Sequence, residues 1–250
     1  MNTPILILSA LAEELGELSA AMVGGSVVEV GGHRFSVGSI DGVDVVVGAV
    51  GVGKVNAAMV ATLAIDRFSP RLLVFTGVAG GVDPARSIGD VVVADTTVQH
   101  DAGVAGPDGF YPYQAGHLPF FDPTDVVGYQ PSPGLLEQAR AALEEVELDR
   151  VLDRPPELVF GTVATGDQFI ESEADRVRIL ATFGAQAVEM EGAAVAQVAE
   201  HFEVDCLVIR ALSDLAGAGS EVDFERFLSE VSTNSIKVVR ALIGAVAADS

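Results

Sequence analysis

The chain has 250 residues, of which 49% are hydrophobic and 20% are charged, so it can bury the core of one α/β domain and is too apolar for a disordered chain. Its 36 acidic and 14 basic residues give a net charge of −22, which repels phosphate backbones and argues against nucleic acid as a partner. No apolar run approaches the roughly 18 residues of a membrane-spanning helix, so we expect no membrane partner either.

Short β-branched runs alternate with segments of helical period along the chain. The first half predicts strands at Ile5–Leu8, Val27–Val30, Arg34–Ile40 and Val43–Ala49, a helix at Lys54–Phe68, and strands at Leu72–Thr76 and Val91–Asp95. The second half predicts strands at Val159–Ala164, Ala187–Glu189 and Leu207–Ala211, and helices at Glu173–Phe183, Met190–His201 and Phe224–Ala248.

This alternation predicts a single α/β domain over residues 1–250, with a mixed central sheet flanked by helices on both sides. The β-rich stretch around residue 40 is punctuated by Gly31-Gly32 and Asp41-Gly42, a hairpin pattern, so we expect the sheet to close partly into a barrel. Residues 100–132 break the alternation, because they are rich in Pro, Gly and aromatic residues and show neither period. A loop of that length in a compact domain is usually functional.

Two glycine-rich turns follow predicted strands. The run Gly48–Lys54 nearly matches a phosphate-binding loop, but Val55 stands where a Ser or Thr should hold magnesium, and Asn56 breaks the dinucleotide pattern. This turn therefore either packs a strand tightly against a helix or forms the wall of a ligand pocket. The run Thr76–Gly81 has small residues that would let a flat ligand approach the backbone, although a plain turn explains it too.

Four carboxylates stand at the ends of predicted strands: Glu14, Glu189, Glu191 and Asp214. Each alone could be a helix cap or a solvated surface residue. In open α/β sheets, however, ligands bind beyond the carboxyl ends of the strands, so together these acids predict a site there.

We expect a cytoplasmic protein without metal or cofactor. The N-terminal segment has no basic region and reaches acids at Glu13 and Glu14, unlike a signal peptide. The single cysteine, Cys206, cannot form an internal disulfide and fits a reducing compartment. The four histidines show no metal-ligand spacing.

These motifs, in this order, resemble the purine nucleoside phosphorylase/nucleosidase superfamily and, within it, the 5'-methylthioadenosine/S-adenosylhomocysteine nucleosidases. The resemblance runs from Ile5 to about the end of the last helix. Its marks are Ser9–Glu14, Gly51–Val55, Thr76–Gly81, Gly89–Asp95, Thr165–Asp167, Val188–Glu191 and Arg210–Asp214. The resemblance implies a nucleoside phosphorylase-like fold, a nucleoside substrate and a homodimer. Exposed aromatics in a long loop commonly mark an interface, so we expect residues 100–132 at or near the dimer contact.

The resemblance also implies roles for single residues. Glu14 would activate water, and Asp214 would protonate N7 of adenine. The other implied site residues are Met190 and Glu191 on the ribose, Phe169, Ile170, Ala79 and Gly80 on the base, and Arg210 and Ser213 in support of the acids. In addition, Leu11, Val52 and Phe224 are expected to form an apolar wall around the 5' substituent. The sequence departs from the family pattern at Val78, where many members have Ser, and at Leu11, where others have Met.

Adenine leaves poorly as an anion, so Asp214 must hold a proton near neutral pH, while Glu14 must stay ionised to deprotonate water. Two carboxylates in different environments can divide the roles in this way. Phosphorylases bring arginines to phosphate, whereas the first arginine here is Arg34, which favours hydrolysis. Two alternatives remain open: a futalosine-type nucleoside hydrolase of the same superfamily, and a nucleoside-binding protein without turnover.

Overall fold

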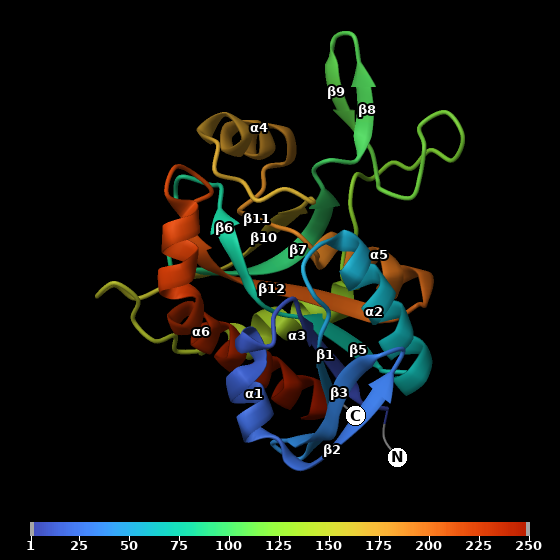
Figure 1. The fold of residues 1–250 in the computed structure, drawn as a ribbon, viewed down its shortest axis with the longest axis vertical. Helices are drawn as coiled ribbons and strands as arrows, with labels where there is room; N and C mark the ends of the chain where they lie inside the picture. The colour runs from blue at the N-terminus through green and yellow to red at the C-terminus, as the bar shows by residue number, and fades with distance from the viewer. Residues whose placement is uncertain (1–2, 249–250) are drawn as a thin grey trace.

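The computed structural model describes residues 3–248 and has the alternating α/β architecture that the sequence predicts (Figure 1). The strands are β1 (Ile5–Ser9), β2 (Val23–Val30), β3 (His33–Ile40), β4 (Val43–Ala49), β5 (Leu72–Phe75), β6 (Val78–Gly81), β7 (Val91–Gln99), β8 (Gly103–Gly106), β9 (Gly109–Pro112), β10 (Leu158–Thr165), β11 (Ala187–Glu189) and β12 (Asp205–Asp214). The helices are the short 3-10 helix η1 (Glu13–Leu15), α1 (Gly16–Ala21), α2 (Lys54–Phe68), α3 (Pro133–Leu143), α4 (Glu173–Phe183), α5 (Gly192–His201) and α6 (Ser220–Ala248).

One sheet of ten strands organises the fold, in the order β2-β3-β4-β1-β5-β12-β6-β11-β10-β7. Its centre is parallel, with β1 between β4 and β5, and β5 beside β12. The end strand β7 also pairs antiparallel with β12, which closes β12, β6, β11, β10 and β7 into a barrel. The long strand β12 thus belongs to both the open sheet and the barrel, and the expected partial closure is confirmed.

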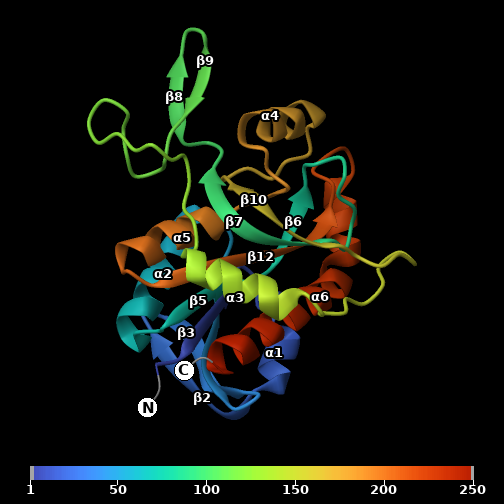
Figure 2. The ribbon, with the colours of Figure 1, turned by 180° about the vertical axis from the view of Figure 1, so that it is seen from behind.

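Two helical layers cover the central sheet. Helices α2 and α5 pack on one face, around a core that includes Ala57, Val60 and Val195. Helix α6 lies on the other side with α1 and α3, and contributes Phe227 and Val231 to a second core. Figures 1 and 2 show α1 and α6 on the opposite side of the molecule from α2 and α5, with α3 crossing the middle. Because both faces are covered, the central strands are buried along their length, as parallel strands usually are.

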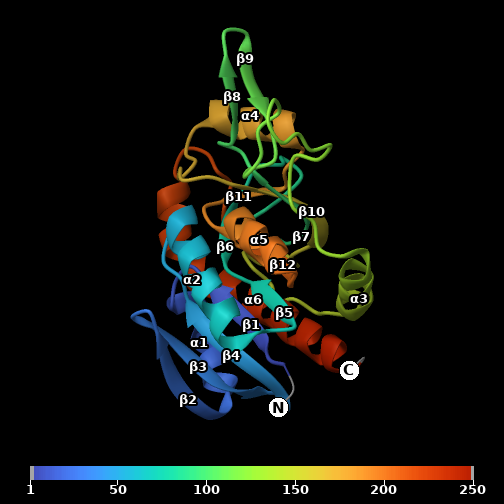
Figure 3. The ribbon, with the colours of Figure 1, turned by 90° about the vertical axis from the view of Figure 1, so that its right-hand side faces the viewer.

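The structure corrects several details of the sequence-based prediction. Residues 100–132 are not wholly without regular structure, because β8 and β9 form a hairpin there that extends beyond the body of the molecule beside α4 (Figure 3). Each strand has only four residues, too few for a clear period. Residues 78–81 form β6, a buried strand of the barrel wall, rather than a turn. Helix α3 was missed although Ser132 caps it, its Oγ accepting a hydrogen bond from the Leu135 N–H.

The remaining differences concern boundaries. Strand β7 continues four residues beyond the predicted Asp95, to Gln99, and β12 reaches Asp214. The short helices η1 and α1 follow β1, in a stretch for which the sequence predicted no element. None of the helices within residues 3–248 is long and apolar enough to cross a membrane.

Candidate active site

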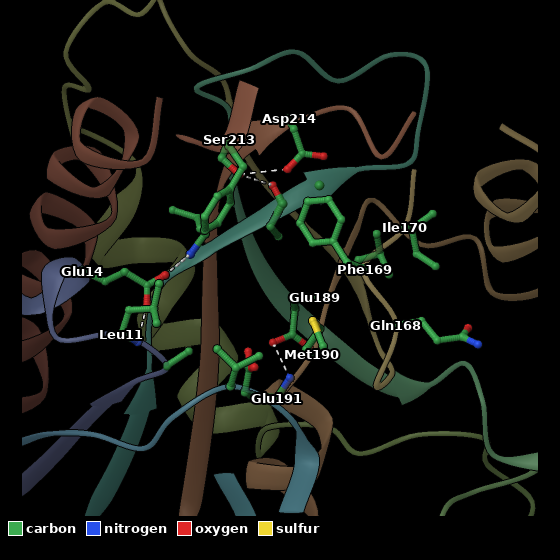
Figure 4. A pocket seen from close by; sticks show the side chains of 17 residues that line it. Leu11, Glu14, Gln168, Phe169, Ile170, Glu189, Met190, Glu191, Ser213 and Asp214 are labelled. Carbon is green, nitrogen blue, oxygen red and sulfur yellow. Dashed lines mark hydrogen bonds between the residues drawn. The ribbon is translucent and has the colours of Figure 1, made fainter. Parts of the chain in front are cut away.

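One cavity opens beside the carboxyl ends of β1 and β12, where the open sheet meets the barrel (Figure 4). Its empty volume is about 750 Å³, including the open space at its mouth. The lining comes from segments scattered over the whole chain: Ala10, Leu11, Glu14, Val52, Val78, Ala79, Gly80, Gln168, Phe169, Ile170, Val188, Glu189, Met190, Glu191, Ser213, Asp214 and Phe224. These residues include carboxylates but no lysine or arginine.

Glu14 is buried in η1, and three donors hold its carboxylate in one orientation. The Ser9 hydroxyl donates to Oε2 over 2.5 Å, and the Leu11 N–H donates to the same oxygen over 2.9 Å. The Val78 N–H donates to Oε1 over 2.9 Å. The last contact uses the backbone, so it does not depend on the side chain at position 78. The Glu14 carboxylate therefore acts as an acceptor at the wall of the cavity.

Asp214 ends β12 and lies on a different part of the cavity wall from Glu14 (Figure 4). Its Oδ1 accepts from the Ala216 N–H over 2.8 Å, and its Oδ2 accepts from the Ser213 hydroxyl over 3.0 Å. Burial raises the pKa of Asp214 above its usual range, and these hydrogen bonds only partly oppose the shift. The structure therefore favours a proton on Asp214 at a pH where exposed aspartates are ionised.

A buried ion-pair cluster underlies the cavity. The Arg210 guanidinium, only 1% exposed, donates from Nε to Glu189 Oε2 over 3.1 Å and also pairs with that oxygen through Nη2. Its Nη2 lies 3.7 Å from Glu191 Oε2. Burial disfavours the charge of Arg210, but the attraction of Glu189, Glu191 and Glu14 outweighs it and raises the pKa. A Cβ on Gly77 would lie 2.5 Å from Arg210 Nη1, so only glycine leaves room for this side chain.

Glu191 is held at the beginning of α5, with its Oε1 accepting the Gly53 N–H over 2.7 Å. Burial and the neighbouring Glu189 raise the pKa of Glu191 to about 7, although Arg210 opposes the shift. The Gly48–Lys54 turn is therefore more than tight packing between β4 and α2. It holds a carboxylate of the cavity through Gly53 and contributes Val52 to the wall.

The rest of the wall is apolar. The ring of Phe169, 49% exposed, meets that of Phe224 edge to face, with 6.2 Å between centroids. Leu11, Met190 and Ile170 line other parts of the cavity. The aromatic residues and the backbone of β6 give the cavity flat surfaces suited to a planar ring system.

Twelve of the thirteen sequence-predicted site residues line this one cavity, and the exception is Arg210. Arg210 does not line the cavity and pairs with Glu189, which does. The sequence placed Glu189 among the acids of a predicted site but gave it no individual role, and it gave none to Ser9, which stands inside the motif Ser9–Glu14. Among residues 3–248, no group of three or more His, Cys, Asp or Glu side chains is arranged to hold a metal ion.

Replacement of Glu191 by Gln should weaken the pH dependence of folding stability. Because the pKa of about 7 lies above the ordinary 4.5, the folded state holds a proton that the unfolded chain releases between these values. The contribution of Glu191 to the free energy of unfolding is therefore full below about pH 4.5. It is lost as the pH rises through about 7, a change of ~3 kcal/mol. Urea denaturation at about pH 5 and about pH 8, at one protein concentration, measures it. If the wild type and Glu191→Gln lost equal stability between these two pH values, the raised pKa would not belong to Glu191.

Comparison with known proteins agrees with this geometry. Residues 4–244 match the phosphorylase superfamily. A 5'-methylthioadenosine/S-adenosylhomocysteine nucleosidase of Mycobacterium bovis is 43% identical over 97% of this chain and 98% of its own. The crystal structure of such a nucleosidase from Colwellia psychrerythraea, in complex with adenine, superposes with a TM-score of 0.85 at 33% identity, covering 98% of this chain and 96% of that one.

A futalosine hydrolase mutant of Helicobacter pylori is similar as well, with a TM-score of 0.84 at 30% identity over 97% of this chain and 99% of that one. The fold is therefore shared by enzymes named for different substrates. The family match and the curated relatives both extend over nearly the whole chain. The chain belongs to the phosphorylase superfamily and, within it, to the 5'-methylthioadenosine/S-adenosylhomocysteine nucleosidases.

Proposed function

We propose that this protein hydrolyses the N-glycosidic bond of 5'-methylthioadenosine and S-adenosylhomocysteine and releases adenine. The observation that carries the proposal is a pair of buried carboxylates, Glu14 and Asp214, held by different donors on one largely apolar cavity. The activity in the names of its relatives agrees with this chemistry. Cys206 is a buried free thiol, which supports a cytoplasmic location.

In the proposed reaction, Asp214 donates its proton to N7 of adenine while the bond between C1' and N9 breaks. The bonding electrons leave with the base, which departs as neutral adenine, and the sugar gains oxocarbenium character. Glu14 takes a proton from the water that attacks C1', so the ribose product carries a hydroxyl there. The raised pKa of Asp214 supports its role as the acid, and the three donors around Glu14 keep that carboxylate aimed as an acceptor.

The ribose and the base contact other parts of the wall. Glu191 is proposed to accept a hydrogen bond from a sugar hydroxyl beside Met190. Phe169 is proposed to stack on the base, and the Ile170 backbone to read its edge, with Ala79 and Gly80 behind the ring. Arg210 and Ser213 support the carboxylates through the contacts described above.

Water is the favoured acceptor because the cavity has no cation to hold phosphate. Recognition of phosphate needs a fork such as arginine provides. None of the residues that line the cavity is lysine or arginine, and Arg210 is already paired with Glu189. The Glu14 carboxylate would also repel the anion.

The expected order of substrates follows from the apolar wall formed by Leu11, Val52 and Phe224. Each methylene buried there adds roughly 0.8 kcal/mol, or about fourfold in affinity, whereas a 5'-phosphate gains nothing. We expect 5'-methylthioadenosine to be cleaved well, S-adenosylhomocysteine and 5'-deoxyadenosine measurably, and AMP hardly at all. Adenine release without phosphate and with a chelator present measures this.

Loss of activity in the chelator, or ribose 1-phosphate as product, would contradict hydrolysis without phosphate or metal. Equal kcat/KM values for AMP and 5'-methylthioadenosine would contradict the apolar wall. A preference for futalosine would favour the alternative that the Helicobacter pylori structure supports. Tight adenine binding without turnover of any substrate would favour a binding protein.

Asp214→Asn and Glu14→Gln should each lower kcat by at least ~10²-fold, the scale of a lost general acid or base. Both changes are nearly isosteric, so circular dichroism and thermal unfolding should remain close to wild type. Near-normal turnover in either variant would show that the role belongs to another residue.

We also propose a homodimer, with residues 100–132 at or near the contact. This segment carries large exposed aromatic side chains, with Phe120 80% and Phe121 85% accessible. Side chains of this size are rarely left exposed together except where another surface covers them. Tyr113 and Pro119 of the same segment do not line the cavity of their own chain, and we propose that they complete the 5' wall of the second copy.

Light scattering at micromolar concentration should therefore give twice the chain mass of 25.8 kDa. The double variant Phe120→Ser, Phe121→Ser should weaken association, because it removes apolar surface that a contact would bury. Val23→Ser is a control, since Val23 is also an apolar and exposed side chain but lies in β2, at the far end of the molecule (Figure 1). A fully active wild-type monomer would contradict the proposal.

A further inference from the structure

Three chain segments meet beside the cavity through one pair of charges. Lys54 is the first residue of α2, and its Nζ lies 2.7 Å from Asp101 Oδ1 and 3.2 Å from Gln99 Oε1. Asp101 follows β7, and its other oxygen, Oδ2, accepts the Asp167 N–H over 3.2 Å. The Lys54 and Asp101 side chains are only 20% and 27% exposed, so solvent screens their attraction less than at an open surface.

Asp167 supplies a cap that α2 lacks in its own sequence. The N-cap residue of α2 is Gly53, which has no side chain to accept a hydrogen bond. Instead, Asp167 Oδ1 accepts the Lys54 N–H over 2.9 Å, although the two residues are 113 positions apart. A carboxylate at this end of a helix also interacts favourably with the helix dipole.

The three residues therefore form a closed set of contacts, which we call the Asp167 clasp: Lys54, Asp101 and Asp167. Lys54 contacts both acids, through its Nζ and its backbone N–H, and Asp101 contacts Asp167. The hydrogen bond from Lys54 lowers the pKa of Asp101 below its usual range against the effect of burial. The clasp joins the glycine turn, the end of β7 and the segment that follows β10.

Two of the three joined segments continue directly into the cavity wall. One residue before Lys54, the Gly53 N–H donates to Glu191, and Val52 lines the cavity. Directly after Asp167, Gln168, Phe169 and Ile170 line another part of it. Gly53 has a φ of +94°, and a Cβ there would lie 3.1 Å from Asp167 Oδ1, so the turn and the carboxylate fit closely.

We propose that Asp167 is a positioning residue, which through the clasp sets the distance between the Gly53–Glu191 contact and the Phe169 ring. This inference rests on the proposed function, because the two walls are assigned there to ribose and base. Asp167 does not itself line the cavity. The donors that hold Glu14 and Asp214 lie outside the clasp. Loss of the clasp should therefore disturb substrate binding more than the chemical step.

The test compares Asp167→Ala with Asp167→Asn. Alanine removes the acceptor for the Lys54 N–H, whereas the asparagine carbonyl can keep it. We expect Asp167→Ala to raise KM for 5'-methylthioadenosine about tenfold while kcat stays within about threefold, and Asp167→Asn to recover most of the loss. Asp66→Ala is the control, since it removes an exposed acid further along α2 and should leave both constants unchanged.

A second arm tests the ion pair of the clasp. Lys54→Met and Asp101→Asn should each raise KM, and the double variant should be no worse than the more severe single one, because both remove the same interaction. Additive effects on KM would contradict a shared role. An unchanged KM in Asp167→Ala would also contradict the proposal. The same holds if kcat, KM and melting temperature changed equally in Asp167→Ala and Asp167→Asn.

A readout without turnover separates this inference from the proposed function. Hydrogen exchange at the backbone amides of Gly53 and Lys54 should be faster in Asp167→Ala than in wild type and close to wild type in Asp167→Asn. Unchanged exchange in Asp167→Ala would overturn the clasp even if the enzyme is a nucleosidase. Conversely, if the wild type released adenine from no substrate, the proposed function would be wrong. The hydrogen-exchange result would then still decide whether the clasp exists.

Discussion

The burial of one guanidinium is the constraint on which the site depends. Arg210 projects from β12, the strand shared by the open sheet and the barrel, into a region where Glu189, Glu191 and Glu14 are all buried. Such a group of acids would be very costly to bury without a cation. Since Arg210 is completely enclosed, it also dictates its surroundings: residue 77 has to be glycine, and Glu189 is held against the guanidinium rather than pointing freely into the cavity.

The same cation separates the environments of the two proposed catalytic acids. Glu14 lies within the influence of Arg210 and accepts three hydrogen bonds. The influences on Asp214, at the end of β12, are burial, local hydrogen bonds and the negative Asp223, and its pKa is raised. A proton donor and an acceptor can then coexist on one cavity, because their surroundings differ and not because their side chains do.

The apolar part of the cavity is where relatives with this fold have room to differ. A methylthioadenosine nucleosidase and a futalosine hydrolase superpose on this chain almost equally well. A common fold can support the same kind of bond cleavage. The preference for one substrate would then depend on the part of the cavity wall that faces the group in which the substrates differ. In the function proposed for this protein, Leu11, Val52 and Phe224 form that wall, and these three cavity-lining residues come from separate segments. Substrate choice can therefore change without any change to the acids.

The sequence alone determined the α/β class, most of the longer strands and helices, and the family of the chain, because buried strands, helical periods and motifs such as Val188–Glu191 are local patterns. It did not reveal the β8–β9 hairpin or strand β6, since four-residue strands are too short to show a period. Nor did it assign a role to Ser9 or Glu189. Ser9 donates a hydrogen bond to Glu14, and Glu189 accepts one from Arg210. Only the tertiary structure decided which charges meet, that Arg210 does not line the cavity, and that Asp167 caps a helix 113 residues away. Hydrogen bonds and pKa shifts depend on distances between segments that are remote in the chain, and no local pattern records those distances.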